Sequence, residues 1–193
     1  MRLQVDKTPI EGVLVISHPD LFEDERGFFL EVFRADEFEK RGLPTQWLQE
    51  NHSRSKKDVV RGLHFQWDKP MAKLMRVTVG SCFLVAVDIR KGSPTLGRWF
   101  GIEASAGNKK QLWAPPGCAR GFYVLSDFAE LQYKCTAIYN PAGEGSICWD
   151  DPAIGIEWPG RDPVLSQKDR TAGSLADWLN SPQSERFRFD PNA

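Results

Sequence analysis

Apolar and polar residues alternate with a period of two along much of this chain, which is typical of strands with one buried face. Two such runs, Lys73–Val79 and Phe83–Ile89, are separated by three residues that begin with Gly80 and Ser81, a pair that favours a turn. In the second run, every other residue from Phe83 to Ile89 is apolar and falls on one face. The pattern therefore predicts a β-hairpin built from these two strands.

Further short strands are predicted along the chain, each bounded by turn residues. They are Gly12–Ser17, Gly27–Phe33, Trp99–Ala104, Gln111–Ala114, Gly121–Val124 and Glu130–Ala137. Helical signals are limited to Ala35–Arg41 and Ser174–Leu179. Many short strands with turns between them predict an all-β sandwich or barrel, here a single domain over residues 1–193 with a peripheral tail at 181–193.

Composition narrows the function classes. The chain has 193 residues, of which 25 are basic and 26 acidic, so its formal net charge is −1. This balance argues against binding to nucleic acids or anionic membranes, because both require an excess of positive charge. No apolar run is long enough to cross a bilayer, and the N-terminus lacks the pattern of a secretory signal. The four cysteines stand singly, which favours a reducing compartment, so we expect a cytoplasmic protein.

Residues that could bind a metal are scarce. The only histidines are His18, His52 and His64, and no two of them have the HxH or HxxxH spacing of a typical metal site. The chain also lacks the GxGxxG, P-loop and GxSxG motifs of dinucleotide, triphosphate and serine-hydrolase chemistry. We therefore expect neither a metal nor an organic cofactor.

His64 is the one histidine whose neighbouring residues suggest a place inside the barrel. Leu63 and Phe65 alternate with His64 and Gln66, so a strand here would direct the polar pair to one face. If that face lines a barrel, the imidazole lies in a partly dry pocket and can serve as a base; a buried histidine satisfied by a hydrogen bond fits equally well. By the same reasoning Asp169 is a solvated charge at an exposed helix cap.

Several motifs follow one another from about residue 5 to residue 175. They are Asp24–Glu31, similar to DxRGxFxE; Gln49–Ser53, similar to QxNxS; Arg61–Gln66, similar to RGLHxQ; and Leu165–Asp169, with Tyr133-Lys134, Tyr139–Pro141 and Trp149–Pro152 between them. In this order and spacing the chain resembles the dTDP-4-dehydrorhamnose 3,5-epimerase family, the RmlC-type cupins. The resemblance implies a cupin jelly-roll barrel with a few short peripheral helices, and a homodimer that exchanges N-terminal strands.

The resemblance also implies a set of site residues. His64 matches the general base, Asp169 its carboxylate partner, Tyr133 the acid on the opposite face, and Lys73 the cation near the substrate ketone. The positions that match substrate-binding residues are Arg26, Phe29, Glu31, Gln49, Asn51, Arg61, Arg120, Tyr139, Glu144 and Lys168.

These residue types suit the chemistry that the resemblance implies. A proton beside a ketone is weakly acidic, and it becomes accessible when a charge such as that of Lys73 stabilises the enolate oxygen. An imidazole such as His64 titrates near neutral pH, and a neighbouring carboxylate fixes its tautomer. Inversion further needs a donor on the other face, a role that the phenol of Tyr133 can fill.

One position departs from the family pattern. The family usually reads GFxHGF, whereas Gly117–Phe122 places Arg120 where the histidine is expected. An arginine stays charged and cannot act as a general base at neutral pH. Arg120 either keeps a hydrogen-bonding role towards a different sugar or nucleotide, or disables one of two epimerisations, or is a tolerated change at a supporting position.

The expected function is inversion at C3 and C5 of a nucleotide-linked 4-keto-6-deoxy sugar, of the type that converts dTDP-4-dehydro-6-deoxyglucose to dTDP-4-dehydrorhamnose. One alternative is an epimerase that acts only at C3 or C5 of a different NDP-4-keto sugar. A second is a cupin that binds a sugar nucleotide without catalysis. A metal-dependent cupin oxygenase is the weakest rival. The pattern does not decide between thymine, cytosine and guanine as the base.

Overall fold

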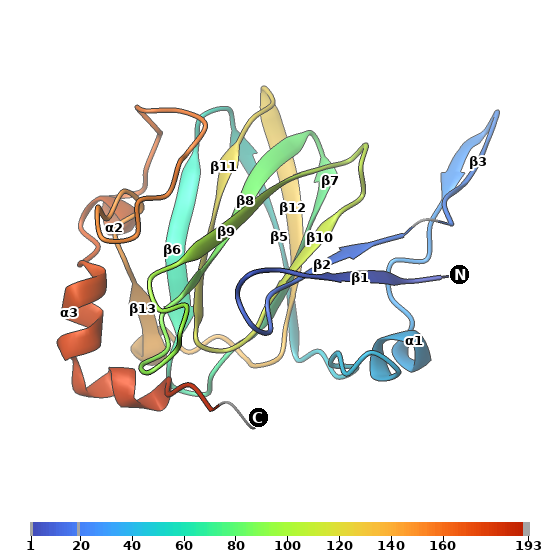
Figure 1. Cartoon of the computed structure of the whole chain (residues 1–193). Coiled ribbons are helices and arrows are strands. Elements are labelled where there is room, and N and C mark those ends of the chain that lie inside the picture. The colour runs from blue at the N-terminus through green and yellow to red at the C-terminus, as the bar shows by residue number, and fades with distance from the viewer. Residues whose placement is uncertain (1, 19, 191–193) are drawn as a thin grey trace.

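Two antiparallel sheets face each other and enclose a core, as the computed structural model shows for residues 2–18 and 20–190 (Figure 1). The six-stranded sheet has the order β1 (Gln4–Lys7), β2 (Leu14–Ser17), β10 (Gln111–Ala114), β7 (Lys73–Val79), β12 (Phe128–Cys135) and β5 (Gln49–Lys56). The five-stranded sheet has the order β13 (Glu144–Ser146), β6 (Val60–Gln66), β11 (Cys118–Val124), β8 (Ser81–Asp88) and β9 (Trp99–Ser105). The expected all-β class is confirmed.

The remaining elements are short. They are the two-stranded ribbon β3 (Phe22–Asp24) and β4 (Gly27–Phe29), the helices α1 (Ala35–Glu39), α2 (Gln167–Arg170) and α3 (Leu175–Asn180), and the 3₁₀ helices η1 (Pro141–Gly143) and η2 (Pro182–Arg186). Both predicted helices are confirmed within a residue or two. Ser174 caps α3, because its hydroxyl accepts the Asp177 N–H while the Asp177 carboxylate accepts the Ser174 N–H.

The core is layered, because both sheets are covered on their outer faces. Met75 and Leu84 point between the sheets, where they belong to one buried cluster. Val85 and Phe65 point outward from the five-stranded sheet into a second cluster that includes Trp178 of α3. A third cluster packs beneath α1 on the outer face of the six-stranded sheet. Strands such as β8 are therefore buried on both faces.

The predicted hairpin around Gly80 and Ser81 is wrong. β7 and β8 have the expected alternation, but β7 pairs with β10 and β12, whereas β8 pairs with β9 and β11. Gly80 is the point at which the chain passes from one sheet to the other, with φ at +73°. A two-residue turn signal is the same for a hairpin and for such a crossing, because only the partner strands distinguish them.

A side chain at this crossing should be costly. A Cβ on Gly80 would overlap the Phe128 carbonyl oxygen, and the positive φ already disfavours an L side chain. We expect Gly80→Ala to lower the free energy of unfolding by about 3 kcal/mol. Urea denaturation tests this, with Gly107→Ala as a control, since an added Cβ there meets only Ser105 Oγ at 3.6 Å. Equal midpoints for the two variants would contradict the expectation.

Two further expectations need correction. The predicted strand Gly27–Phe33 ends at Phe29, because its only partner, β3, begins at Phe22, which pairs with Phe29. The tail at 181–193 was expected to be peripheral, but its described part, residues 181–190, packs against the five-stranded sheet. Phe187 is buried in the cluster beneath α3, with its ring 6.1 Å from that of Phe65.

Candidate functional site

The centre of the site is a histidine–carboxylate pair. His64 projects from β6 between the sheets, and its Nε2 lies 2.6 Å from Oδ1 of Asp169 on α2. The side chain of Asp169 is 3% exposed and that of His64 is 26% exposed. The carboxylate is thus buried behind the imidazole, and the other ring nitrogen of His64 is left for a substrate. The expectation from local sequence that Asp169 is a solvated charge is wrong.

A short helix holds the carboxylate in place. Ser166 caps α2: its hydroxyl accepts the Asp169 N–H at 3.1 Å and donates to the second carboxylate oxygen at 2.8 Å. Burial opposes ionisation of Asp169, but the hydrogen bonds from His64 and Ser166 hold its pKa below the ordinary value. An ionised carboxylate fixes the imidazole tautomer and makes the imidazole a stronger base.

The opposite wall supplies a phenol and an ammonium group. Tyr133 on β12 and Lys73 on β7 belong to the six-stranded sheet, whereas His64 belongs to the five-stranded sheet. All three side chains line one cavity, and Nζ of Lys73 lies 4.8 Å from the centroid of the Tyr133 ring. A flat molecule between the sheets would therefore meet the imidazole on one face and the phenol on the other.

Burial sets the charge states on this wall. It raises the pKa of Tyr133, so the phenol stays protonated at neutral pH and can donate a proton. Burial, with a smaller contribution from the positive charge of Arg120, lowers the pKa of Lys73 to about 8. Lys73 is then mostly charged at pH 7 and readily loses its proton above pH 8.

The lowered pKa of Lys73 should make the folding stability depend on pH. The pKa of Lys73 is about 8 in the folded chain against an ordinary 10.5, so between these values the unfolded chain binds more protons and stability rises with pH. Between pH 8 and pH 10.5, we expect the free energy of unfolding of the wild type to rise by about 2–3 kcal/mol relative to that of Lys73→Met. Urea unfolding at a series of pH values measures the difference. Parallel curves for the two proteins would show that Lys73 titrates normally.

Several residues that the resemblance implies form the rim of this cavity. Asn51 pairs with Tyr133 across β5 and β12, which places it beside the phenol. Gln49 donates to Oδ1 of Asn51 at 3.0 Å, and its own oxygen accepts the Tyr139 N–H at 2.7 Å. Arg61 lines the cavity with its side chain towards solvent and donates from Nε to Ser55 Oγ at 3.0 Å.

A second rim network lies beside the histidine. Glu144 on β13 accepts a hydrogen bond from the Tyr139 hydroxyl at 2.8 Å and forms an ion pair with Lys168. Lys168 precedes Asp169 on α2, and β13 pairs directly with the strand that carries His64. Tyr139, Glu144 and Lys168 are therefore brought next to the dyad, as the resemblance implies.

Three expected site residues lie elsewhere. Arg26 and Phe29 belong to the β3–β4 ribbon, which projects from the side of the molecule opposite α2 (Figure 1). The Arg26 side chain is 85% exposed and forms an ion pair with Asp24. Glu31 follows the ribbon and lies 4.0 Å from Arg34. None of the three lines the cavity that contains His64.

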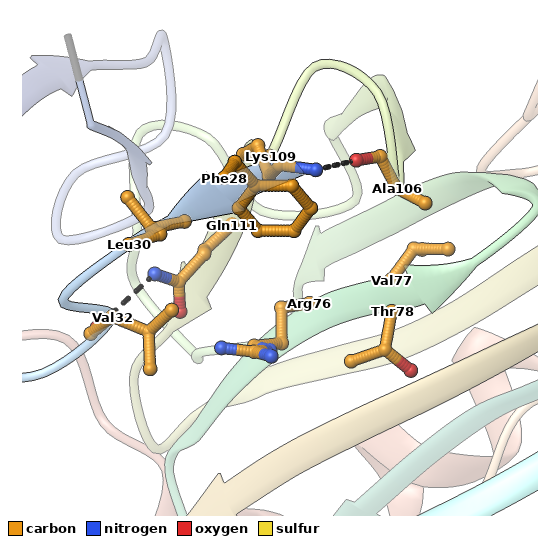
Figure 2. Close-up of a pocket in the computed structure, with 9 residues that line it drawn as sticks. All are labelled: Phe28, Leu30, Val32, Arg76, Val77, Thr78, Ala106, Lys109 and Gln111. Carbon is orange, nitrogen blue, oxygen red and sulfur yellow. Dashed lines mark hydrogen bonds between the residues drawn. The ribbon is translucent and has the colours of Figure 1, made fainter. Parts of the chain in front are cut away.

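A separate hollow lies on the other face of β7 (Figure 2). Its lining includes Phe28, Arg76, Lys109 and Gln111, and Nζ of Lys109 lies 3.8 Å from the centroid of the Phe28 ring. Arg76 points into this hollow, because it alternates with the residues that face the core. The hollow contains no acid–base pair comparable to the dyad, so it is not the candidate catalytic site.

Some contributors were not predicted. Ser166 positions Asp169, and the spacing of a serine three residues before an acid is a recognisable capping signal. Ser53, Met75, Phe122 and Leu131 also line the cavity. Their only signal is the strand alternation, which does not reveal which face will be interior.

Two properties of the described residues bear on other function classes. Within residues 2–18 and 20–190, no group of three or more His, Cys, Asp or Glu side chains is arranged to hold a metal ion. In the same part of the chain, every helix is too short or too polar to span a membrane.

The matching family model and a curated relative carry the same description. Residues 7–177 match the family described as dTDP-4-dehydrorhamnose 3,5-epimerase. The chain is 53% identical over 174 residues to the dTDP-4-dehydrorhamnose 3,5-epimerase of Salmonella typhimurium, a match that covers 89% of this chain and 94% of the relative.

Solved structures agree. RmlC from Legionella pneumophila, a dTDP-6-deoxy-D-glucose-3,5-epimerase in complex with dTDP-4-keto-L-rhamnose, is 44% identical with a TM-score of 0.91, over 98% of this chain and 100% of that chain. ChmJ from Streptomyces bikiniensis, a 3′-monoepimerase in complex with dTDP-quinovose, is 34% identical with a TM-score of 0.84, over 89% of this chain and 88% of that chain. The expected cupin-type jelly roll is thereby confirmed.

Proposed function

The chain belongs to the dTDP-4-dehydrorhamnose 3,5-epimerase family, and from that premise we propose that it is the isomerase that converts dTDP-4-dehydro-6-deoxyglucose to dTDP-4-dehydrorhamnose. The observation that carries this proposal is the placement of the His64–Asp169 pair and of Tyr133 on opposite walls of one cavity. Inversion at carbon requires that a proton leave one face and return to the other. A protein that only bound the sugar would have no need of this arrangement.

The proposed reaction is a balanced proton transfer at each carbon. The free ring nitrogen of His64 takes the proton from the carbon beside the ketone, and the C–H electron pair forms an enolate. The positive charge of Lys73 stabilises the enolate oxygen inside the cavity. Tyr133 then delivers a proton to the opposite face, and the ketone forms again. His64 gives its proton to water and Tyr133 takes one up from water, so both groups are restored before the second carbon reacts. No electrons are gained or lost overall, so the substrate's own ketone provides the activation.

Hydrogen exchange tests this function directly. The purified protein is mixed with dTDP-4-dehydro-6-deoxyglucose in deuterated water, and deuterium at C3 and C5 is followed by NMR and mass spectrometry. Incorporation at both carbons with formation of the inverted sugar supports the 3,5-epimerase. If neither carbon exchanges, this substrate is wrong or the protein is a binding cupin, and the same assay with CDP- and GDP-linked keto sugars separates those two.

A second candidate is an epimerase that inverts one centre only. Two observations favour considering it: Arg120 stands where the family usually has histidine, and the chain resembles a 3′-monoepimerase over most of its length. Incorporation of deuterium at only one carbon would select this candidate.

The active enzyme is proposed to be a homodimer in which the ribbon completes the partner's site. Phe22, Phe28 and Phe29 are 62%, 56% and 69% exposed, an unusual apolar surface on a two-stranded ribbon that pairs with no other strand in residues 2–18 and 20–190. Arg26 and Phe29 match substrate-binding positions of the family, yet their ribbon lies on the side of the molecule opposite α2, the helix that carries Asp169 (Figure 1). A second copy would cover the phenylalanines and bring these residues to a substrate.

Mixed dimers test this exchange. Phe29→Ser and His64→Ala are each expected to be nearly inactive as pure dimers, the first through the ribbon and the second through the base. Co-expressed in equal amounts, they should recover about a quarter of wild-type activity, because half of the dimers are mixed and each then has one complete site. If ribbon and base act within one chain, the mixture stays inactive.

The cytoplasmic location is also part of this proposal. All four cysteines are free thiols, and three of them are buried within the core.

A further inference from the structure

Arg120 is a buried cation whose hydrogen bonds are incomplete. Its side chain lies on β11, the residue is 3% exposed, and Nη2 donates to the Met71 carbonyl oxygen. Nε and Nη1 have no acceptor within the described part of the chain. Buried polar groups are nearly always paired, so these N–H groups call for an acceptor that the chain itself does not supply.

The fold directs Arg120 to the reacting part of the cavity. Arg120 lies directly opposite His64 across β11 and β6, so both side chains project from the same face of the sheet. Both line the cavity, together with Lys73 from the facing sheet. Within the described residues, neither Arg120 nor Lys73 has an ion-pair partner. One buried cation, Arg120, and one half-buried cation, Lys73, thus flank the base without an ion-pair partner among the described residues.

Arg61 and Arg120 line the same cavity but differ in burial, so they are suited to different parts of the substrate. Arg61 lines the same cavity but is exposed, so it is suited to the pyrophosphate, whose charge does not change in the reaction. Arg120 is buried beside the base, where the sugar ring must lie for its α-protons to reach His64. The only substrate atom there that gains charge is the ketone oxygen, and it does so whichever neighbouring carbon loses its proton.

We propose that Arg120 is a catalytic residue that donates its free N–H groups to the ketone oxygen at C4 and, together with Lys73, forms the oxyanion site for the enolate. This proposal rests on the epimerase function proposed above and adds the residue that stabilises its intermediate. Met71 anchors one end of the guanidinium, so the remaining donors are held in place before the substrate binds, which is the arrangement that favours a transition state over the ground state. The histidine usual in the family could not provide a permanent charge.

The proximity of Arg120 to Lys73 should affect how kcat/KM depends on pH. The charged and titratable groups near Lys73 are Arg120, Cys135, Tyr133, Glu144 and Lys168. Loss of the Lys73 proton near pH 8 should produce an alkaline limb in kcat/KM. Because the positive charge of Arg120 lowers the pKa of Lys73, Arg120→Met should move this limb to higher pH.

The test compares Arg120→Met, Arg120→Lys and Arg120→His with the wild type and with Arg76→Met, which removes a half-buried arginine from the opposite face of β7. Deuterium exchange gives kcat and KM at each carbon. Titration with dTDP alone measures the affinity of the nucleotide site. For Arg120→Met we expect kcat to fall about 10²–10³-fold at both carbons, while the affinity for dTDP changes less than about threefold. Arg120→Lys should have a kcat about tenfold higher than that of Arg120→Met, because it restores a positive charge. Arg76→Met should keep the wild-type rate.

The possible results are distinct. Wild-type kcat in Arg120→Met, or loss at one carbon only, would overturn the proposal, because one oxygen serves both enolates. An equal loss of dTDP affinity, or wild-type behaviour of the alkaline limb, would indicate a structural role and also overturn it. A wild type that exchanges at neither carbon of the dTDP-, CDP- and GDP-linked keto sugars would overturn the epimerase function and this inference together, whereas a wild type that exchanges normally leaves Arg120→Met to test this inference alone. If Arg120→Met does not fold, Arg120→Gln, which keeps N–H donors without charge, is expected to lose kcat about 10–10²-fold.

Discussion

Replacing His64 with alanine is expected to lower proton exchange at C3 and C5 together, by about 10²–10⁴-fold. Its ring nitrogen is the one imidazole among the residues that line the cavity, and its buried partner Asp169 lies behind it. Deuterium incorporation at each carbon, measured at saturating substrate, reports the loss. The affinity for dTDP should change little, because the imidazole acts on the sugar.

His52→Ala is the matched control. His52 lies on β5, an edge strand of the six-stranded sheet, and its side chain is on the exposed surface, where it contacts Glu130 at 3.0 Å. It should exchange deuterium at the wild-type rate. Asp169→Asn should give an intermediate loss, since the base remains but its tautomer is no longer fixed by a carboxylate. Substantial exchange in His64→Ala would mean that another group removes the protons.

Tyr133→Phe is expected to separate exchange from inversion. His64 can still remove a proton and return a deuteron to the same face, so incorporation should fall by less than about tenfold. Formation of the inverted sugar should fall by about 10²-fold or more, because the opposite face loses its donor. The variant also removes only one oxygen, so the ring remains beneath Lys73.

NMR distinguishes the two outcomes in one sample, since it reports both deuterium content and configuration. Equal losses of exchange and inversion would indicate that the phenol assists proton removal rather than reprotonation. Unchanged inversion would assign the second donor to another group, and the proposed division of labour between the two sheets would be wrong.

Local features of this protein followed from the sequence by itself. Alternation placed Met75 and Val77 on one face of β7 and Val85 and Val87 on one face of β8, and the structure buries both sets. The helix α3 was predicted at Ser174–Leu179 from the stop signal that follows it, and the structure has it at Leu175–Asn180. These features depend on neighbours within a few residues, so the chain encodes them directly. The ordered motifs likewise identified the family over most of the chain.

Only the tertiary structure decided which strands meet and which charges are buried. The same turn signal at Gly80 fits a hairpin and a passage between sheets, and long-range pairing chose the second. Asp169 looked solvated because local sequence cannot show that His64, 105 residues away, lies above it. Burial of Arg120 and exposure of Phe29 were equally hidden, because the exposure of a side chain depends on segments distant in sequence that pack around it.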